Sequence, residues 1–246
     1  MRTFPAAQLF LSAIVIASAC FLAFAPASGA DPENTKVSEK PGDNTAAQAA
    51  HSSADKSDAD GFVPLFDGKS LDGWVVTNCK AGVEDGNMVV LEGNGLVRTD
   101  KAYGDFVLEL EWKNRQAENY DAGVFFRAEP PRRGPWPGRY QINLLQGQEG
   151  TLVYHAKGKA AGLARGGDWN RLRLTATGTT AELEINGKPA WKVDDIKSPT
   201  GIIGIQVEVP KGGQFEFRNI RVKPLTPPTP VPSTQPAAQT TGDAGK

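Results

Sequence analysis

The residues whose types and spacing could do chemistry lie in two short segments, DAGVFFR at 121–127 and YQINLLQG at 140–147. Both alternate between apolar and polar residues, as strands with one buried face do. The faces turned away from the core would carry Asp121, Arg127, Gln141 and Asn143. Amide and guanidinium groups form planar, paired hydrogen bonds. This face is therefore suited to a ligand rich in hydroxyl groups.

Other polar positions on predicted strands extend the same face. The further members are Glu109, Glu111, Gln206 and Glu208. Amides gain little on a strand unless they hydrogen-bond to something. Trp136, in the loop between the two segments, and Tyr140 or Tyr154 could stack on a sugar ring. The alternative is an ordinary solvated face with no ligand.

The elements that must position these residues are all strands, because no helical periodicity occurs between residues 61 and 225. Hairpin turns are expected at 84–87 and at Asn186-Gly187. Further strands are expected at 106–112, 172–175, 181–185, 202–209 and 215–222. About a dozen strands joined by short turns predict an all-β fold, a two-sheet antiparallel jelly-roll sandwich.

The two ends of the chain differ in composition from this central region. Residues 1–30 have a basic start, an apolar run and a small-residue cleavage site, so we expect a signal peptide and an exported protein, periplasmic or secreted. A lipoprotein at Cys20 is the less favoured alternative, and the apolar run is too short for a membrane span. Residues 31–60 and 226–246 are predicted to be a disordered linker and a disordered Pro/Thr-rich tail around a domain at 61–225.

Charge and cysteine content exclude several classes of function. The net charge of −1, with no basic tract, argues against nucleic acid or an anionic membrane as partner. After cleavage only Cys79 would remain, so no intrachain disulfide is expected. No Cys/His spacing typical of a zinc site occurs.

Several motifs together resemble the DUF1080 family, also called the 3-keto-disaccharide hydrolase or 3-keto-glucoside 1,2-lyase/3-keto-2-hydroxyglucal hydratase domain. The motifs are FVPLFDGKSLDGW at 62–74, YGDFVLE at 103–109, GVFFR at 123–127, DWN at 168–170, ING at 185–187, GIIGIQ at 201–206 and FRNIRV at 217–222. This resemblance implies a concanavalin A-like jelly roll, usually exported from bacteria, that acts on carbohydrates. Many of these motifs shape turns or fill the core, so they identify the family without locating its chemistry.

The chain departs from the family pattern on the proposed binding face. The family typically has glutamate, glutamine and aspartate where this chain has Gln141, Asn143 and Gln146. An amide cannot transfer a proton or ligate a metal as a carboxylate does. A divalent metal is possible by analogy with the family, but these replacements weaken that expectation.

The activity implied by the resemblance needs a base for the proton on C2, an acid for the leaving group on C1, and a donor to the enolate oxygen. We expect Glu208 and Asp121 to be the acid and base, because Glu208 shares the strand face of Gln206. His155 is a third candidate. Arg127 could serve the enolate, with a buried structural salt bridge as the alternative, for example to Glu111.

The sequence therefore favours a carbohydrate-active enzyme of the 3-keto-glycoside lyase/hydratase or hydrolase type. The alternatives are a non-catalytic carbohydrate-binding module on the same fold and an interaction module within an exported scaffold. Arg127, Gln141, Asn143, Gln206, Trp136 and Tyr140 are the predicted ligand contacts.

Overall fold

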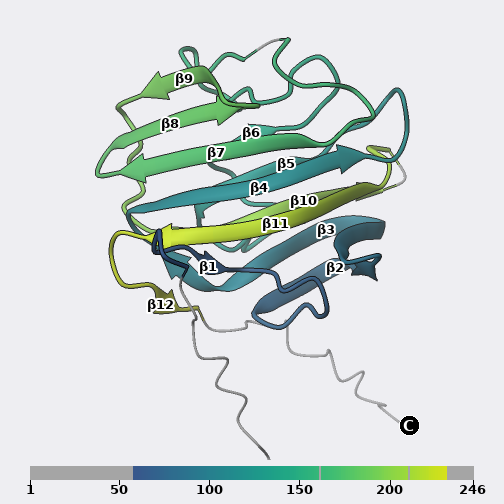
Figure 1. The fold of residues 1–246 in the computed structure, drawn as a ribbon, viewed down its shortest axis with the longest axis horizontal. Coiled ribbons are helices and arrows are strands. Elements are labelled where there is room, and N and C mark those ends of the chain that lie inside the picture. Colours follow the sequence, from purple (N-terminus) through teal and green to yellow (C-terminus); the bar gives the residue numbers. More distant parts are fainter. Residues whose placement is uncertain (1–57, 161, 210, 232–246) are drawn as a thin grey trace, which may run out of the picture. The chain divides into compact units, whose positions relative to one another are not determined.

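The computed structural model describes residues 58–160, 162–209 and 211–231 (Figure 1). In these residues the only regular elements are twelve strands, as predicted, and no helix occurs that could cross a membrane. The strands are β1 (Val63–Pro64), β2 (Trp74–Glu84), β3 (Asn87–Tyr103), β4 (Phe106–Asn114), β5 (Gly123–Ala128), β6 (Gln141–Asn143), β7 (Asn170–Thr177), β8 (Thr180–Ile185), β9 (Lys188–Val193), β10 (Gly201–Val209), β11 (Phe215–Pro224) and β12 (Thr229–Pro230).

The strands form one antiparallel sheet, in the order β6-β5-β10-β3-β11-β4-β7-β8-β9, that curls over the long strand β3. Residues 93–103 of β3 pair with β10, whereas residues 88–90 pair with β11. We call β6, β5, β10 and residues 93–103 of β3 layer 1, and β11, β4, β7, β8 and β9 layer 2. The predicted jelly-roll sandwich is confirmed, with its two sheets continuous through β3.

The core lies between the two layers and holds the apolar side of each alternating strand. Val124 and Ile205 of layer 1 and Leu110 and Leu174 of layer 2 are at most 1% exposed and belong to one cluster. Burial of each such side chain stabilises the fold by about 1.5–3 kcal/mol. Polar residues at the intervening positions are thereby directed to the outer faces of the layers.

Both predicted hairpins are present. In the turn between β2 and β3, Asp85 and Gly86 have φ angles of 49° and 78°; between β8 and β9, Asn186 and Gly187 have φ angles of 53° and 75°. Two consecutive positive φ angles match the twist of a two-residue hairpin. Asn, Asp and Gly tolerate this conformation best, which is why these turns can be recognised from the sequence.

Strand β5 contains a β-bulge that disturbs its alternation. Gly204 of β10 pairs with Phe125 and Ile202 pairs with Ala128, so two residues of β5 lie opposite one residue of β10. The extra residue is Arg127, whose φ angle is 44°. An extra residue interrupts the alternation of faces. The side chain of Arg127 therefore need not follow Gly123 and Phe125 to the outer face.

The ordered strands extend slightly beyond the predicted domain. Asp58 pairs with Arg221 at 2.8 Å, and β12 pairs with β3 beyond residue 225. The predicted signal peptide at 1–30, with Cys20, lies outside the described residues, as do residues 31–57 of the linker and 232–246 of the tail.

Candidate functional site

A chain of polar side chains crosses the outer face of layer 1. The Gln141 amide nitrogen donates to the Gln206 amide oxygen at 2.5 Å, and the Gln206 nitrogen donates to a Glu208 carboxylate oxygen at 3.1 Å. Gln141 lies on β6 and the other two on β10, on either side of β5. The structure thus brings together three of the residues that the sequence predicts for the site.

Gly123 of β5 lies beneath this chain. It pairs with Gln206 on one side and with Asn143 on the other. A Cβ atom at position 123 would lie 2.2 Å from the side-chain nitrogen of Gln141. The amide of Gln141 can reach across β5 to Gln206 only because position 123 has no side chain.

Backbone hydrogen bonds to Gly212 link Asp121 to Glu208. The Asp121 N–H donates to the Gly212 carbonyl at 2.9 Å, and the Gly212 N–H donates to the Glu208 carbonyl. A Cβ atom at position 212 would lie 2.0 Å from the Asp121 carbonyl oxygen, so only glycine allows this approach. Burial, and after it the negative charge of Glu208, raises the pKa of Asp121 to about 6.

This carboxyl pair can do acid–base chemistry. No lysine or arginine in the described ranges lies within ion-pair distance of either carboxyl group. Burial and the negative charge of Glu208 together favour the protonated form of Asp121. A carboxyl group that holds its proton close to neutral pH is suited to proton transfer.

Asn143 and Trp136 border the amide chain. Asn143, 9% exposed, accepts the Leu145 N–H at 3.3 Å. The indole N–H of Trp136 donates to the Gly95 carbonyl at 2.9 Å, and Trp136 packs against the small apolar cluster formed by Leu96, Phe125, Ala128 and Ile202. Trp136 thus lies on the outer face of layer 1, as its predicted role requires, and its ligand contact stays a prediction.

Arg127 does not take the predicted position. Its side chain is fully buried, and it donates to Asp105 and to the Gly104 carbonyl at 2.7 Å each, and to the Gly178 carbonyl at 2.5 Å. The bulge turns it away from the amide chain. The structure therefore corrects its predicted role as a ligand contact: Arg127 forms the alternative buried salt bridge, with Asp105 rather than Glu111.

Tyr140 and His155 also lie apart from the amide chain. Tyr140 is stacked on Phe126 at 5.6 Å between ring centroids, on the core side of the strand, because its neighbour Gln141 points outward. Its predicted stacking on a sugar ring is therefore corrected. His155 hydrogen-bonds to Asp195 at 2.6 Å, and no bond to the carboxyl pair occurs among the described residues. That pairing does not support a catalytic role for His155.

Glu109 and Glu111 lie on layer 2, contrary to the expectation that they share a face with Gln206. Glu109 pairs with Arg173 and Glu111 with Arg171 in the ladder between β4 and β7. Burial tends to raise the pKa of Glu109, but hydrogen bonds from Arg221, Arg171 and Arg173 outweigh it and hold this pKa below its usual value. A pocket of about 370 Å³ next to Glu109 is lined by these paired charges.

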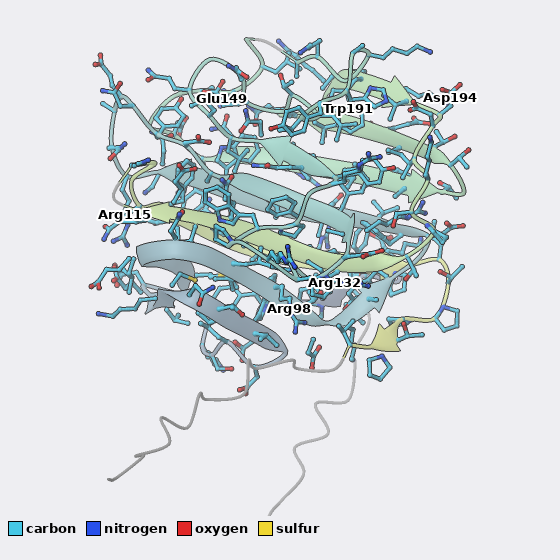
Figure 2. All side chains as sticks on the ribbon, turned by 180° about the vertical axis from the view of Figure 1, so that it is seen from behind. Arg98, Arg115, Arg132, Glu149, Trp191 and Asp194 are labelled. Carbon is cyan, nitrogen blue, oxygen red and sulfur yellow. The ribbon has the colours of Figure 1, made fainter. Side chains whose placement is uncertain are left out.

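Sequence reasoning missed three residues in layer 1 or next to it. The roles of Gly123 and Gly212 depend on contacts between strands that no local pattern reveals. Arg98, 4% exposed, faces Gly204 across the ladder and donates to the Thr99 carbonyl at 2.9 Å (Figure 2). Burial lowers the pKa of Arg98, and the charge of Asp100 opposes this effect.

The residues around the carboxyl pair do not fit a resident divalent metal. The described part of the chain contains no group of three or more His, Cys, Asp or Glu side chains that could hold an ion. Asp121 and Glu208 would supply two carboxylates, and the remaining neighbours are amides, which are weaker ligands than charged oxygens. We therefore derive no catalytic step through a metal.

Residues 61–223 match the family model of the 3-keto-alpha-glucoside-1,2-lyase-like domain. The match covers β1 to β10 and all but the last residue of β11, and it confirms the family resemblance seen in the sequence. A comparison with curated proteins finds no match.

Solved structures support the same fold. Two candidate glycosyl hydrolases of Parabacteroides distasonis ATCC 8503 are each 20% identical, with TM-scores of 0.58 and 0.56. The alignment with the first covers 68% of this chain and 95% of the matched chain. The alignment with the second covers 67% of this chain and 99% of the matched chain. The carbohydrate-binding module CBM66 of Bacillus subtilis is 13% identical, with a TM-score of 0.50 and coverage of 61% and 95%. At these identities the likeness shows the fold alone.

Proposed function

Because this chain belongs to the 3-keto-alpha-glucoside-1,2-lyase-like domain family, we propose that it is an enzyme that cleaves 3-keto-glycosides by elimination and hydration across C1 and C2. One observation carries the proposal: Asp121 and Glu208 form a carboxyl pair without a cationic partner among the described residues, and the pKa of Asp121 is raised to about 6. Carboxyl pairs whose proton affinities differ are suited to acid and base roles.

In the proposed elimination, ionised Glu208 removes the proton from C2, which the neighbouring ketone acidifies. The electron pair of the C–H bond forms the C1–C2 double bond as the C1–O bond breaks, with the C3 oxygen carrying the enolate charge in between. Protonated Asp121 gives its proton to the departing oxygen. Water then adds to C1 and a proton returns to C2, so the net reaction is hydrolysis of the glycoside.

The amide chain can stabilise the enolate oxygen. The side-chain nitrogens of Gln141 and Gln206 each use one N–H within the chain, at 2.5 and 3.1 Å, and each amide has a second N–H. Neutral donors fixed by their neighbours stabilise developing negative charge without reorganisation. In this proposal the two glutamines take the role that the sequence suggested for Arg127.

The test is to incubate the purified protein with 3-keto-glucosides and to follow the absorbance of the enone-type glycal and the release of the leaving group. We expect turnover by the wild type, and a rate that falls as the pH rises through about 6, because Asp121 then loses its acidic proton. An unchanged pH profile in Asp121→Asn would contradict the assignment of Asp121 as the acid.

A non-catalytic carbohydrate-binding module is the second candidate, and Gln146 favours it. This residue, at a family acid position, accepts the backbone N–H of Asn119 at 2.8 Å, so it supports a loop. Saturable binding of 3-keto-glucosides without turnover would establish this alternative.

Export is part of the proposal and rests on the signal-like composition of residues 1–30. Fractionation of the producing cells would test it, and full-length protein retained in the cytoplasm would contradict it.

A further inference from the structure

A second hollow lies at the opposite end of β5 from the carboxyl pair. Its volume is about 470 Å³, and Arg127, Tyr140 and Lys197 are among its lining residues. Asp121 precedes β5 and Arg127 is near its end, which in an extended strand separates them by about 20 Å. The hollow is therefore distinct from the amide chain.

Positive charge dominates this hollow. Arg139 and Lys197 are exposed side chains of its wall, and within the ranges that the structure describes neither has a carboxylate within ion-pair distance. Arg127 also lines the hollow, but its guanidinium is fully buried and paired with Asp105, so it supplies no unpaired charge. The acid among the lining residues is Glu129. Two cations thus face the hollow without a counter-ion from the protein.

The wall that carries these cations is rigid. The Tyr140 hydroxyl accepts the backbone N–H of Lys197 at 2.8 Å, and the Tyr140 ring is stacked on Phe126. The Arg127 guanidinium donates to the Ser198 carbonyl at 3.4 Å. Because the backbone at 197–198 is held from two sides, less conformational entropy is lost when a ligand binds.

The loop that contributes Glu129, Gly138 and Arg139 to the hollow carries two more basic residues. It joins β5 to β6 and contains Arg132, labelled in Figure 2, and Arg133; both are exposed. Such a group of cations attracts anions from solution and raises their association rate. In a chain whose net charge is −1, this concentration of positive charge is a local feature.

We propose that the hollow binds an anionic group, a carboxylate or a sulfate, of an acidic oligosaccharide. This inference rests on the proposed function and narrows its substrate class to acidic oligosaccharides. Arginine pairs with carboxylate and sulfate oxygens through a planar fork of donors, and lysine adds a point charge.

The test uses isothermal titration of the whole protein with glucuronate, sulfate and glucose as probes. We expect saturable binding of glucuronate that weakens as salt is added, and glucose binding at least about tenfold weaker. The double variant Arg139→Ala/Lys197→Ala should lose about tenfold or more in glucuronate affinity. The matched control Lys69→Ala/Lys188→Ala removes the same charge elsewhere on the surface and should bind as the wild type does.

Three results would overturn the inference. They are equal affinity for glucuronate and glucose, an Arg139→Ala/Lys197→Ala variant that binds glucuronate unchanged, and binding of neither glucuronate nor sulfate by the wild type. Glu208→Gln separates the two proposals, since it should keep glucuronate binding while losing turnover. Failure of the wild type to turn over 3-keto-glucosides would instead contradict the proposed function, whatever the glucuronate result.

Discussion

The two layers present carboxylates to their outer faces in opposite ways. On layer 2, Glu109 receives hydrogen bonds from three arginines, which hold its pKa below the usual value. On layer 1, Asp121 has Glu208 as its charged neighbour, and its pKa rises to about 6. The residue types are the same, but the surroundings differ. A carboxylate that is paired with arginines, such as Glu109, stabilises the sandwich. The Asp121 and Glu208 carboxyl groups have no such cationic partner among the described residues, and we propose that they transfer protons.

The largest expected effect is on turnover. Glu208→Gln keeps the shape of the side chain and removes the base, so kcat for 3-keto-glucosides should fall by about 10²–10⁴-fold. The melting temperature should stay close to that of the wild type. The matched change on layer 2, Glu109→Gln, should lower the melting temperature and leave kcat almost unchanged. A Glu208→Gln variant with a lowered melting temperature and unchanged kcat, or a Glu109→Gln variant with a strongly lowered kcat, would contradict this contrast between the layers.

Arg127→Ala tests a neutralised charge on layer 1. It leaves the Asp105 carboxylate and several carbonyls without their donor, so we expect the free energy of unfolding to fall by about 3–5 kcal/mol. Denaturant titration measures this change. A stable variant with weakened ligand affinity would instead restore Arg127 as a ligand contact.

Glu109→Ala should have a smaller effect, about 2–3 kcal/mol, because the arginines that surround Glu109 are partly exposed and can turn to solvent. The pKa of Glu109 is lower in the folded than in the unfolded state, so its stabilisation is present above pH 4.5 and is lost as the pH falls through the folded-state pKa. The difference in stability between variant and wild type should therefore shrink in acid. A difference that does not depend on pH would show that lost packing, not charge, explains it.

Asp121→Asn should produce the smallest change in the free energy of unfolding, and in the opposite direction. A raised pKa means that the ionised group destabilises the folded state above about pH 6, and that this penalty is absent below pH 3.8. Asparagine should therefore stabilise the protein by about 1 kcal/mol at neutral pH, after allowance for solvent screening, and by almost nothing near pH 3. Thermal unfolding across this pH range measures the effect, and a destabilised variant at pH 7 would contradict it.

Local sequence patterns predicted most of the longer strands and both hairpins, because alternation and the turn residues Asp85-Gly86 and Asn186-Gly187 act over a few neighbouring residues. They did not predict the short strands β1 and β12. They also placed Glu208 on the face of Gln206. Tyr140 could have been excluded as a companion of Gln141, since adjacent strand residues point to opposite faces.

The errors share a different cause. Alternation distinguishes the two faces of a strand without indicating which one meets the core or which strand lies beside it. Glu109 and Arg173 face each other only because β4 pairs with β7. Arg127 left its expected face because of one bulge residue, and the approach of Asp121 to Glu208 depends on Gly212, far along the chain. Such features arise from tertiary pairing, which no short window of sequence contains.

The sharing of β3 between the layers has a consequence for how the molecule assembles. The first residues of β3 pair with β11 and its later residues pair with β10. Both β10 and β11 are distant from β3 in sequence, and both must pair with β3 before the two layers are complete. Closing such long loops before contacts form slows folding. Amide protons along β3 should accordingly exchange with solvent only through global unfolding. The pairing of Asp121 with Glu208 and the ion pairs of Glu109 with its arginines should then be lost in the same cooperative step.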